Sequence, residues 1–460
     1  MTATVVERAG TFRELAGPKW IATSVVLVGG VALQAVNLFL TTSLMPTAIA
    51  DIGGERLYAW STTVFMIASV ASSMLVSRVL AGRGPRGAYL AALVPFIVGT
   101  AVSALSPTMA VMLVGRAIQG VGGGLLAGLA YAVIQTAYPE RLWAKATALV
   151  SAMWAVGTLA GPAIGGAVAQ FGAWRLGFVL LGGLATVIAI IVPRALPRST
   201  SDTVPAPVAW AALTILAAAA GLISVASILT DTAQMVAALV VALLVIGWFV
   251  RRERHSAVRV LPKTTYSRRS PLKWIYLSII VMAMGTIAEA FAPLFSQRLA
   301  GLQPLVAGFL GAAVSVGWSV AMFFSANASR PETVRRLRHA GPAVLAAGLV
   351  VAGLLQQDNA GPWLVAGWFA ALVVAGAGIG IAFPHQLVAA MGSTPDPVEA
   401  GKASAGINTV ETIGLTFGSA FGGLMVNLGS PDMVRSAQFL LFALAAAALF
   451  GAVIARRTDA

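Results

Sequence analysis

The 460-residue sequence contains no cysteine and only three histidines, and charged residues make up only 10% of it. The lack of cysteine excludes disulfides, thiolate nucleophiles and cysteine-ligated zinc or iron–sulfur sites. With so few histidines, we predict neither a metal site nor a cofactor. A typical soluble domain has about 25% charged residues, so the composition also excludes a water-soluble globular protein.

Apolar residues are abundant instead, at 58% of the chain, and they occur in long stretches. A helix needs about 20 such residues to cross the hydrocarbon core of a bilayer. We therefore predict an all-α polytopic membrane protein with fourteen transmembrane helices. The first of these follows the N-terminus without a small-residue cleavage site, so we expect a permanent span rather than a signal peptide. The expected starts lie near Ile21, Tyr58, Ala88, Thr108, Ala144, Trp174, Val208, Ala233, Trp274, Pro304, Ala340, Pro362, Gly401 and Arg435.

The net charge of +14 follows this topology. An even number of spans places both termini on one side of the membrane, and the segments expected on that side carry the excess of lysine and arginine. Positively charged loops remain in the cytoplasm during membrane insertion. We therefore expect a multi-pass protein of a bacterial cell membrane with cytoplasmic N- and C-termini. The basic charge then reflects topology, and no nucleic-acid partner is expected.

The loops also suggest a division of the chain. A long basic linker at residues 251–273 separates the eighth and ninth spans, and similar basic loops follow the second and tenth spans. Six spans, two extra spans and six further spans would form the internal repeat common in secondary transporters. Alternatively, short cytoplasmic loops are simply basic. The predicted parts are a cytoplasmic N-terminal segment (1–20), an N-terminal six-helix bundle (21–193), a linker with two extra spans and a basic loop (194–272), a C-terminal six-helix bundle (273–455) and a cytoplasmic tail (456–460).

Three charged residues fall inside the predicted spans: Arg116, Glu289 and Glu411. A charge at the bilayer centre costs at least about 2.5 to 3.5 kcal/mol, so such residues usually face other helices and have a function. A carboxyl group removed from water exchanges its proton closer to neutral pH, which suits proton coupling. We therefore predict Glu289 and Glu411 as proton-coupling residues and a functional role for Arg116. The alternative is structural: the carboxylates would hold Arg116 or backbone dipoles in place.

Uncharged polar residues share helix faces with these charges. Gln34, Asn37 and Thr41 lie on one face of the first span, Gln119 follows Arg116 by three residues, and Asn408 precedes Glu411 by three. Their hydrogen-bonding groups could line a substrate cavity without titrating. Polar contacts between helices would explain them equally well.

The fifth predicted span contains a run of small residues and one proline: Gly157, Gly161, Pro162, Gly165 and Gly166. Glycines four residues apart let a neighbouring helix approach closely, and a proline inside a helix removes a backbone donor and bends it. Composition and spacing predict only tight packing of a bent helix.

This run resembles the antiporter motif of drug:proton antiporters in the major facilitator superfamily. The segment LVGRAIQGVGGG is similar to the fourth-span motif around a buried arginine, SLMPTAIADIGG to the end of the first span, and AWRLGF to the Trp-Arg run that opens the sixth. Fourteen spans resemble the fourteen-span multidrug branch. The resemblance implies two six-helix bundles around a central cavity, alternating access, a part for Arg116 in proton transfer, and an interface between the bundles formed by the fifth-span run.

The sequence departs from this family pattern at three places. Asn37 stands where the branch frequently has an acidic residue, and Gly82 stands where the family usually has aspartate in a cytoplasmic gate loop that keeps Arg83 and Arg86. Glu411 lies about where the branch often has a basic residue. One hypothesis is that the titratable carboxylate has moved from the first span to the thirteenth.

The favoured function is export of amphipathic or lipophilic small molecules, of the multidrug type, in exchange for protons. Its expected partners are the substrate, protons and membrane lipids, with the chain acting as a monomer. One alternative is a carrier for a single endogenous substrate, such as a lipid, siderophore or biosynthetic product, with weak or no proton coupling. Another is a non-transporting membrane sensor. We expect no enzyme, because no catalytic constellation stands out, and no nucleotide coupling, because no phosphate-binding loop occurs.

Overall fold

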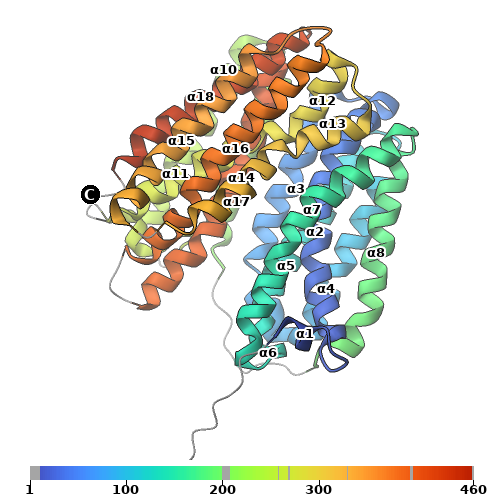
Figure 1. Ribbon diagram of the computed structural model, residues 1–460, viewed down its shortest axis with the longest axis vertical. Coiled ribbons are helices and arrows are strands. Elements are labelled where there is room, and N and C mark those ends of the chain that lie inside the picture. Colours follow the sequence, from blue (N-terminus) through green and yellow to red (C-terminus); the bar gives the residue numbers. More distant parts are fainter. Residues whose placement is uncertain are drawn as a thin grey trace, which may run out of the picture.

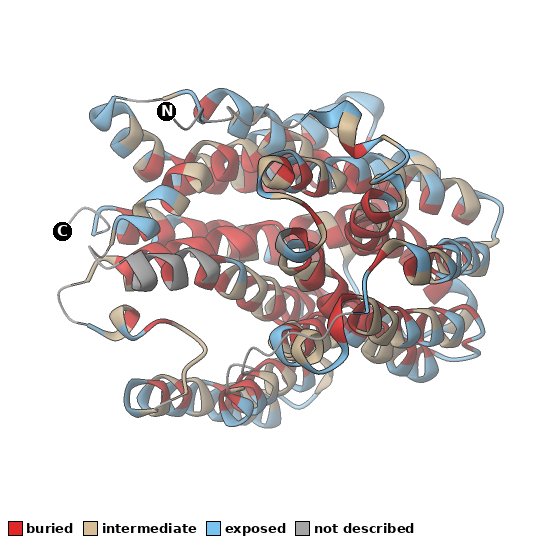
Figure 2. Ribbon diagram, turned by 90° about the horizontal axis from the view of Figure 1, so that it is seen from below, coloured by how far each residue is buried: buried red, intermediate tan, exposed pale blue. Residues whose placement is uncertain are grey.

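The computed structural model describes residues 11–198, 208–256, 258–267, 270–328, 330–393 and 397–457, and in these ranges the chain forms helices and no strand. Figure 1 shows two groups of long helices that lie against each other at the upper end of the view and diverge toward the lower end. Buried residues line the surfaces where helices meet, and exposed residues cover the outside (Figure 2). This arrangement confirms the predicted all-α fold with two groups of packed helices.

The N-terminal bundle packs α2 against α7, α8 and α5, and α4 against α5 and α8, while α3 packs on α5. A short helix, α1, precedes it and touches α7. The elements are α1 (Phe12–Leu15), α2 (Ile21–Ile52), η1 (Glu55–Leu57), α3 (Tyr58–Ser73), α4 (Val76–Ala104), α5 (Met109–Ala132), α6 (Ile134–Ala137), α7 (Glu140–Gln170) and α8 (Trp174–Ala195).

The C-terminal bundle follows a helical hairpin and a short turn, η2. In this bundle α16 packs against α14 and α15, and α18 packs against α15, α17 and α11. The hairpin consists of α9 (Trp210–Ile228) and α10 (Thr232–His255), and η2 spans Lys263–Tyr266. The bundle consists of α11 (Leu272–Gly285), α12 (Ala288–Ala300), α13 (Pro304–Gly311), α14 (Ala313–Ser325), α15 (Pro331–Leu354), α16 (Pro362–Met391), α17 (Pro397–Gly429) and α18 (Met433–Ala455).

Local sequence explains several helix ends. N-cap side chains that accept backbone N–H groups begin four of the described helices: Thr11 at α1, Thr108 at α5, Asp231 at α10 and Asp432 at α18. Such N-caps satisfy donors that have no partner inside the helix. Proline at the first position begins α13, α15 and α16, where its missing N–H costs nothing.

Thirteen helical segments in the described ranges are long and apolar enough to cross a membrane. The remaining predicted span corresponds to α3, which has 16 residues, so the count of fourteen stays a prediction. Two helices begin before the predicted apolar stretch, α7 at Glu140 and α15 at Pro331, and their polar first turns extend beyond the apolar part of the span. The element α4 begins at Val76 because it includes a separate helical part before the kink at Gly84.

Two predicted spans are broken helices. The ninth is divided into α11 and α12 at Thr286 and Ile287, and the tenth into α13 and α14 at Ala312. The two breaks lie close together. A Cβ atom added to Gly311 would lie 2.9 Å from Pro293 and 3.3 Å from the carbonyl oxygen of Glu289. Broken helices expose backbone groups inside the bundle, where side chains can bind them.

The two bundles meet at the end of the molecule away from the termini, called here the distal end and formed by residues 53–57, 171–173, 301–303 and 430–432. Here the Tyr58 hydroxyl donates to the carbonyl of Ala290 at 2.7 Å, and Arg298 pairs with Glu55 at 2.8 Å. The line along which helices of the two bundles meet is called here a seam. On the seam between α3 and α17, Ala59 would lie 2.4 Å from a Cβ atom on Gly423. The opposite end, where the termini lie, is called the terminal end.

Candidate functional site

Arg116 of α5 is a fully buried cation, with 1% of its surface exposed. Its Nη1 donates to Asn37 Oδ1 at 3.0 Å and to Gln119 Oε1, and its Nε donates to the carbonyl of Ser61 at 3.3 Å. The Phe65 ring covers the guanidinium, with its centroid 4.2 Å away. Neutral dipoles and an aromatic face therefore solvate this charge, and no described carboxylate pairs with it.

The polar residues predicted on the first span belong to the same cluster. Thr41 donates to Asn37 Oδ1 at 3.3 Å, and Gln119 Nε2 donates to Thr100 Oγ1 at 2.7 Å. Two buried atoms in this described region have no partner, Gln34 Oε1 and Asn37 Nδ2. Buried polar atoms of this kind usually bind water or a ligand. Thr100 was missed from the sequence because a single threonine in an apolar run carries no signal.

Glu289 lies at the start of α12, beside the break between α13 and α14. Its carboxylate accepts the backbone N–H of Ser315, in the first turn of α14, at 2.5 Å. The first N–H groups of a helix lack partners inside the helix and carry partial positive charge. Glu289 therefore acts as a side-chain cap for the second half of a broken helix. This capping role was not predicted, because it depends on a break that the sequence does not reveal.

Glu411 of α17 is half-buried, and its carboxylate has no hydrogen-bond or ion-pair partner among the described residues. Asn408, one turn away, is exposed. The small residues on the same helix face do not line a cavity: a Cβ atom on Gly414 would lie 2.7 Å from the carbonyl oxygen of Ile280, and Gly418 packs equally closely on α11. The glycines let α17 lie directly against α11, which leaves Glu411 at the edge of this contact.

The structure separates the three predicted charges. Gly422 of α17 packs beside Ile287, next to Glu289, so Glu411 lies eleven residues nearer the terminal end, roughly 16 Å along the helix. Arg116 belongs to the N-terminal bundle with its own neutral partners. Arg116, Asn37, Thr41 and Gln119 thus form one cluster, and the two carboxylates occupy separate places in the C-terminal bundle.

The fifth-span run is divided between two interfaces. Gly157, Gly161 and Gly165 pack on α2 within the N-terminal bundle, where a Cβ atom on each would approach residues 35–43 to 2.5–2.8 Å. Only Pro162 and Gly166 meet the other bundle. A Cβ atom on Gly166 would lie 2.5 Å from Leu305 Cα. The expectation that all five line the interface between the bundles is thus too broad, because a helix turns three of the glycines toward its own bundle.

The predicted gate loop lies at a kink within α4, where Gly84 has a positive φ of 63° and a non-helical backbone that separates two helical parts. Arg83 is exposed and Arg86 is half-buried, and neither side chain pairs with a described carboxylate. The backbone N–H of Arg86 donates to the carbonyl of Pro197 at 3.2 Å. The loop is therefore joined to the end of α8 by its backbone.

Two of the segments that carry the family resemblance meet at the distal end. Asp51, at the end of α2, accepts Trp174 Nε1 at 3.1 Å and Arg175 Nη1 at 2.5 Å. Arg175 also donates to the carbonyl of Ser106 at 3.1 Å. The resulting clamp joins α2, α8 and the loop between α4 and α5. The sequence analysis treated these segments separately and did not predict their contact.

Comparisons with known proteins agree with this architecture. A family model described as Major Facilitator Superfamily matches residues 27–419. The chain is 41% identical to a "probable multidrug-efflux transporter" of Mycobacterium tuberculosis, over 98% of this chain and 97% of that protein. It is 22% identical to multidrug resistance protein 3 of Bacillus subtilis, over 89% of this chain and 81% of that protein.

Solved transporter structures share the fold at low identity. An auto-inhibited peptide transporter of the POT family superposes with a TM-score of 0.66 and 15% identity, covering 95% of this chain and 96% of that chain. The nucleoside transporter NupG superposes with a TM-score of 0.64 and 11% identity, covering 96% of this chain and 99% of that chain. These likenesses concern the fold alone.

Proposed function

Because the chain belongs to the major facilitator superfamily, we propose that it exports amphipathic and lipophilic small molecules across the cell membrane in exchange for protons. The similarity to a protein described as a multidrug-efflux transporter supports the substrate class. The main support for proton exchange is the position of Glu411. Its carboxylate is half-buried in a membrane helix and has no described partner. A charge in that position needs a proton or a cationic ligand to neutralise it.

The proposed moving bodies are the two predicted bundles, residues 21–193 and 273–455, with residues 194–272 between them. Contacts between them gather at the distal end, through residues such as Tyr58, Arg298 and Gly423. If the termini are cytoplasmic, as the basic loops favour, the described conformation is closed toward the outside. Substrate would then enter between the diverging ends of the bundles.

Exchange follows from competition for one carboxylate. Ionised Glu411 attracts a cationic or dipolar group of the substrate, whereas protonated Glu411 is neutral and releases it. Glu289 has a different part: protonation would remove one acceptor for the Ser315 N–H and weaken the cap of α14. We assign Glu411 to coupling, and Glu289 to the conformational response.

The test is substrate-triggered proton movement in proteoliposomes loaded with a pH-sensitive dye, using a panel of lipophilic cations, neutral drugs and lipids. Glu411→Gln should abolish the proton signal and weaken the binding of lipophilic cations, because its amide is neutral, as protonated Glu411 is. Glu332→Gln, at an exposed position at the start of α15, is the matched control and should behave like wild type. Proton movement in Glu411→Gln equal to that of wild type would refute the assignment.

A second function is a carrier for one endogenous substrate without proton coupling. It is favoured by Asn37, an amide that cannot titrate, as the residue that accepts from Arg116. Its signature would be transport of a single compound class that continues after the proton gradient is collapsed with an ionophore. The same vesicles distinguish the two functions.

A further inference from the structure

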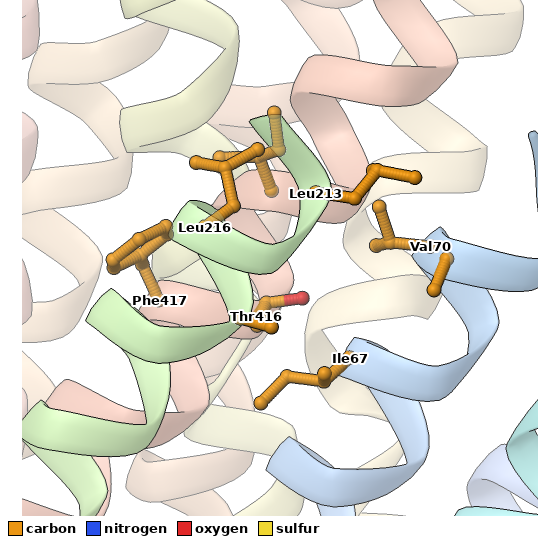
Figure 3. A pocket seen from close by; sticks show the side chains of 9 residues that line it. Ile67, Val70, Leu213, Leu216, Thr416 and Phe417 are labelled. Carbon is orange, nitrogen blue, oxygen red and sulfur yellow. The ribbon is translucent and has the colours of Figure 1, made fainter. Parts of the chain in front are cut away.

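A small apolar pocket lies where α9 covers the seam between the two bundles. Figure 3 shows its walls, which come from α3, α9 and α17. The hydroxyl of Thr416 donates to the carbonyl of Thr412 in its own helix at 2.8 Å, so the lining offers no free polar group. The pocket is lined by Ile67, Val70, Ala71, Leu213, Leu216, Ala217, Ile413, Thr416 and Phe417.

The pocket occupies the wedge at which α3 and α17 begin to diverge. One turn toward the distal end, Thr63 donates to Ser419 at 3.0 Å, and Ser419 donates to the carbonyl of Ala59 at 3.2 Å. Ile67 follows Thr63 by four residues, and Thr416 precedes Ser419 by three. A molecule in the wedge therefore touches both bundles next to their contact and opposes further approach of α3 and α17.

Positive charge lies next to the pocket on the terminal side. Leu216 and Ile413, which line the pocket, belong to a hydrophobic cluster with Phe249 of α10. Arg251 and Arg252 follow Phe249 directly, within about 5 Å along the helix axis. Within the described ranges neither guanidinium has a carboxylate partner, and Arg251 is exposed.

The linker after α10 is folded against the same place. Glu253, which is completely buried, accepts the backbone N–H of Val260 at 3.0 Å and the Tyr266 hydroxyl at 3.1 Å. Val260 packs on the hydrophobic cluster, and Arg259 donates to the carbonyl of Glu253 at 3.0 Å. The negative charge of Glu253 is thus enclosed by the linker, and the accessible charge beside the pocket is positive.

We propose that this pocket binds one acyl chain of an anionic phospholipid, with the headgroup held by Arg251 and Arg252. The apolar walls fit the chain, and basic groups at the cytoplasmic face of a membrane protein attract anionic headgroups. The lipid occupies a site separate from Arg116 and from the two intramembrane carboxylates. Because it fills the wedge between α3 and α17, it stabilises the conformation in which the terminal ends of the bundles diverge.

The test is native mass spectrometry of delipidated full-length protein in detergent, titrated with palmitoyl-oleoyl phosphatidylglycerol or with the phosphatidylcholine of the same chains. Wild type should prefer phosphatidylglycerol. The double variant Arg251→Gln/Arg252→Gln should bind it about 25-fold more weakly, since each basic residue near the surface contributes about fivefold. Arg335→Gln/Arg336→Gln removes two exposed charges from α15 at the same end and should leave the preference unchanged.

A second pair of variants tests the acyl chain. Ala217→Trp fills the pocket and should reduce binding of both lipids, whereas Leu244→Trp adds the same ring on α10, where the side chain is 67% exposed, and should not. Photoreactive phosphatidylglycerol with a diazirine in its acyl chain should label peptides of α3, α9 or α17. Equal binding of the two lipids by wild type, or labelling only elsewhere, overturns the proposal. The readout is binding, so it stands whether or not transport is coupled to protons.

Discussion

Arg116 illustrates how one buried charge can be held by neutral groups. Its partner Asn37 Oδ1 lies 3.0 Å from Nη1, at the position where a carboxylate would form an ion pair. This hydrogen bond already has a charged donor, and a carboxylate acceptor would add the direct attraction between two unit charges. The side chain at position 37 therefore sets how strongly the cluster is held together.

We predict that Asn37→Asp raises the free energy of unfolding by about 1 kcal/mol, because the new carboxylate is placed on an existing cation. Thermal unfolding of purified protein in detergent measures the change. Gln34→Glu is the matched control: it also puts a carboxylate on this face of α2, but at an oxygen without a described partner, so it should lower stability. Changes of the same sign in both variants would contradict the prediction.

A second residue-scale prediction concerns pH. Arg141 binds Glu14 through both carboxylate oxygens at 2.6 Å, and this guanidinium lowers the pKa of Glu14 below its ordinary value. A carboxylate with a depressed pKa stabilises the fold above its unfolded-state pKa, and this contribution is lost as the pH falls through the lower folded value. Glu14→Gln should therefore lower the melting temperature slightly at pH 7 and progressively less as the pH falls below the ordinary pKa of a glutamate. An effect that does not change with pH would show that the pair acts by packing instead.

At the scale of elements, close packing of glycine-bearing helices governs the C-terminal bundle. A Cβ atom on Gly317 of α14 would lie 1.9 Å from the carbonyl oxygen of Val373, and one on Gly376 of α16 would lie 1.8 Å from that of Val314. Each helix thus rests on the backbone of the other. Small residues permit such approaches between membrane helices.

Gly317→Ala should destabilise the protein by about 1 to 3 kcal/mol, because the helices must separate to admit the methyl group. Gly183→Ala in α8, where nothing lies within 4 Å of the added atom, should be neutral or stabilise by about 0.5 to 1 kcal/mol. Unfolding temperatures of both variants in the same detergent check the contrast. A neutral Gly317→Ala would mean that α14 and α16 lie further apart than described.

Much of the fold follows from the lengths of apolar runs, and the elements that escape prediction are those shaped by tertiary contacts. The positions of the long apolar runs predict closely where α5, α8 and α16 begin. They cannot reveal the break at Ala312, where Glu289 replaces a helical partner of the Ser315 N–H. For the same reason the sequence placed Arg116 beside Gln119 but could not bring Phe65 or Thr100 to them, since those contacts join separate helices.

For the whole molecule, the decisive feature is the contact between bundles at the distal end. Because the chain lacks cysteine, introduced pairs report on this contact without background. Thr63→Cys/Ser419→Cys joins α3 to α17 across the seam, where the two hydroxyl oxygens lie 3.0 Å apart and two sulfur atoms in their place are within reach of a disulfide. Oxidation should hold the bundles in the described conformation and abolish transport, and reduction should restore it.

The control pair stays within one bundle. Val281→Cys/Gly451→Cys joins α11 to α18, where a Cβ atom on Gly451 would lie 3.5 Å from that of Val281, the spacing of a disulfide. Its oxidation should leave transport intact, because both helices move together. Loss of transport in both oxidised pairs, or in neither, would show that the bundles do not move as separate bodies.

The position of α9 and α10 makes the molecule unequal on its two sides. α9 packs on α3 and α17 along the seam between them and α10 packs on α9, whereas the other seam, where α7 meets α13 and α14, has no described helix over it. A hydrophobic compound dissolved in the lipid therefore meets α9 at one seam and the bundles themselves at the other. The extra helices therefore make the two lipid-facing sides of the transporter different from each other within the plane of the membrane.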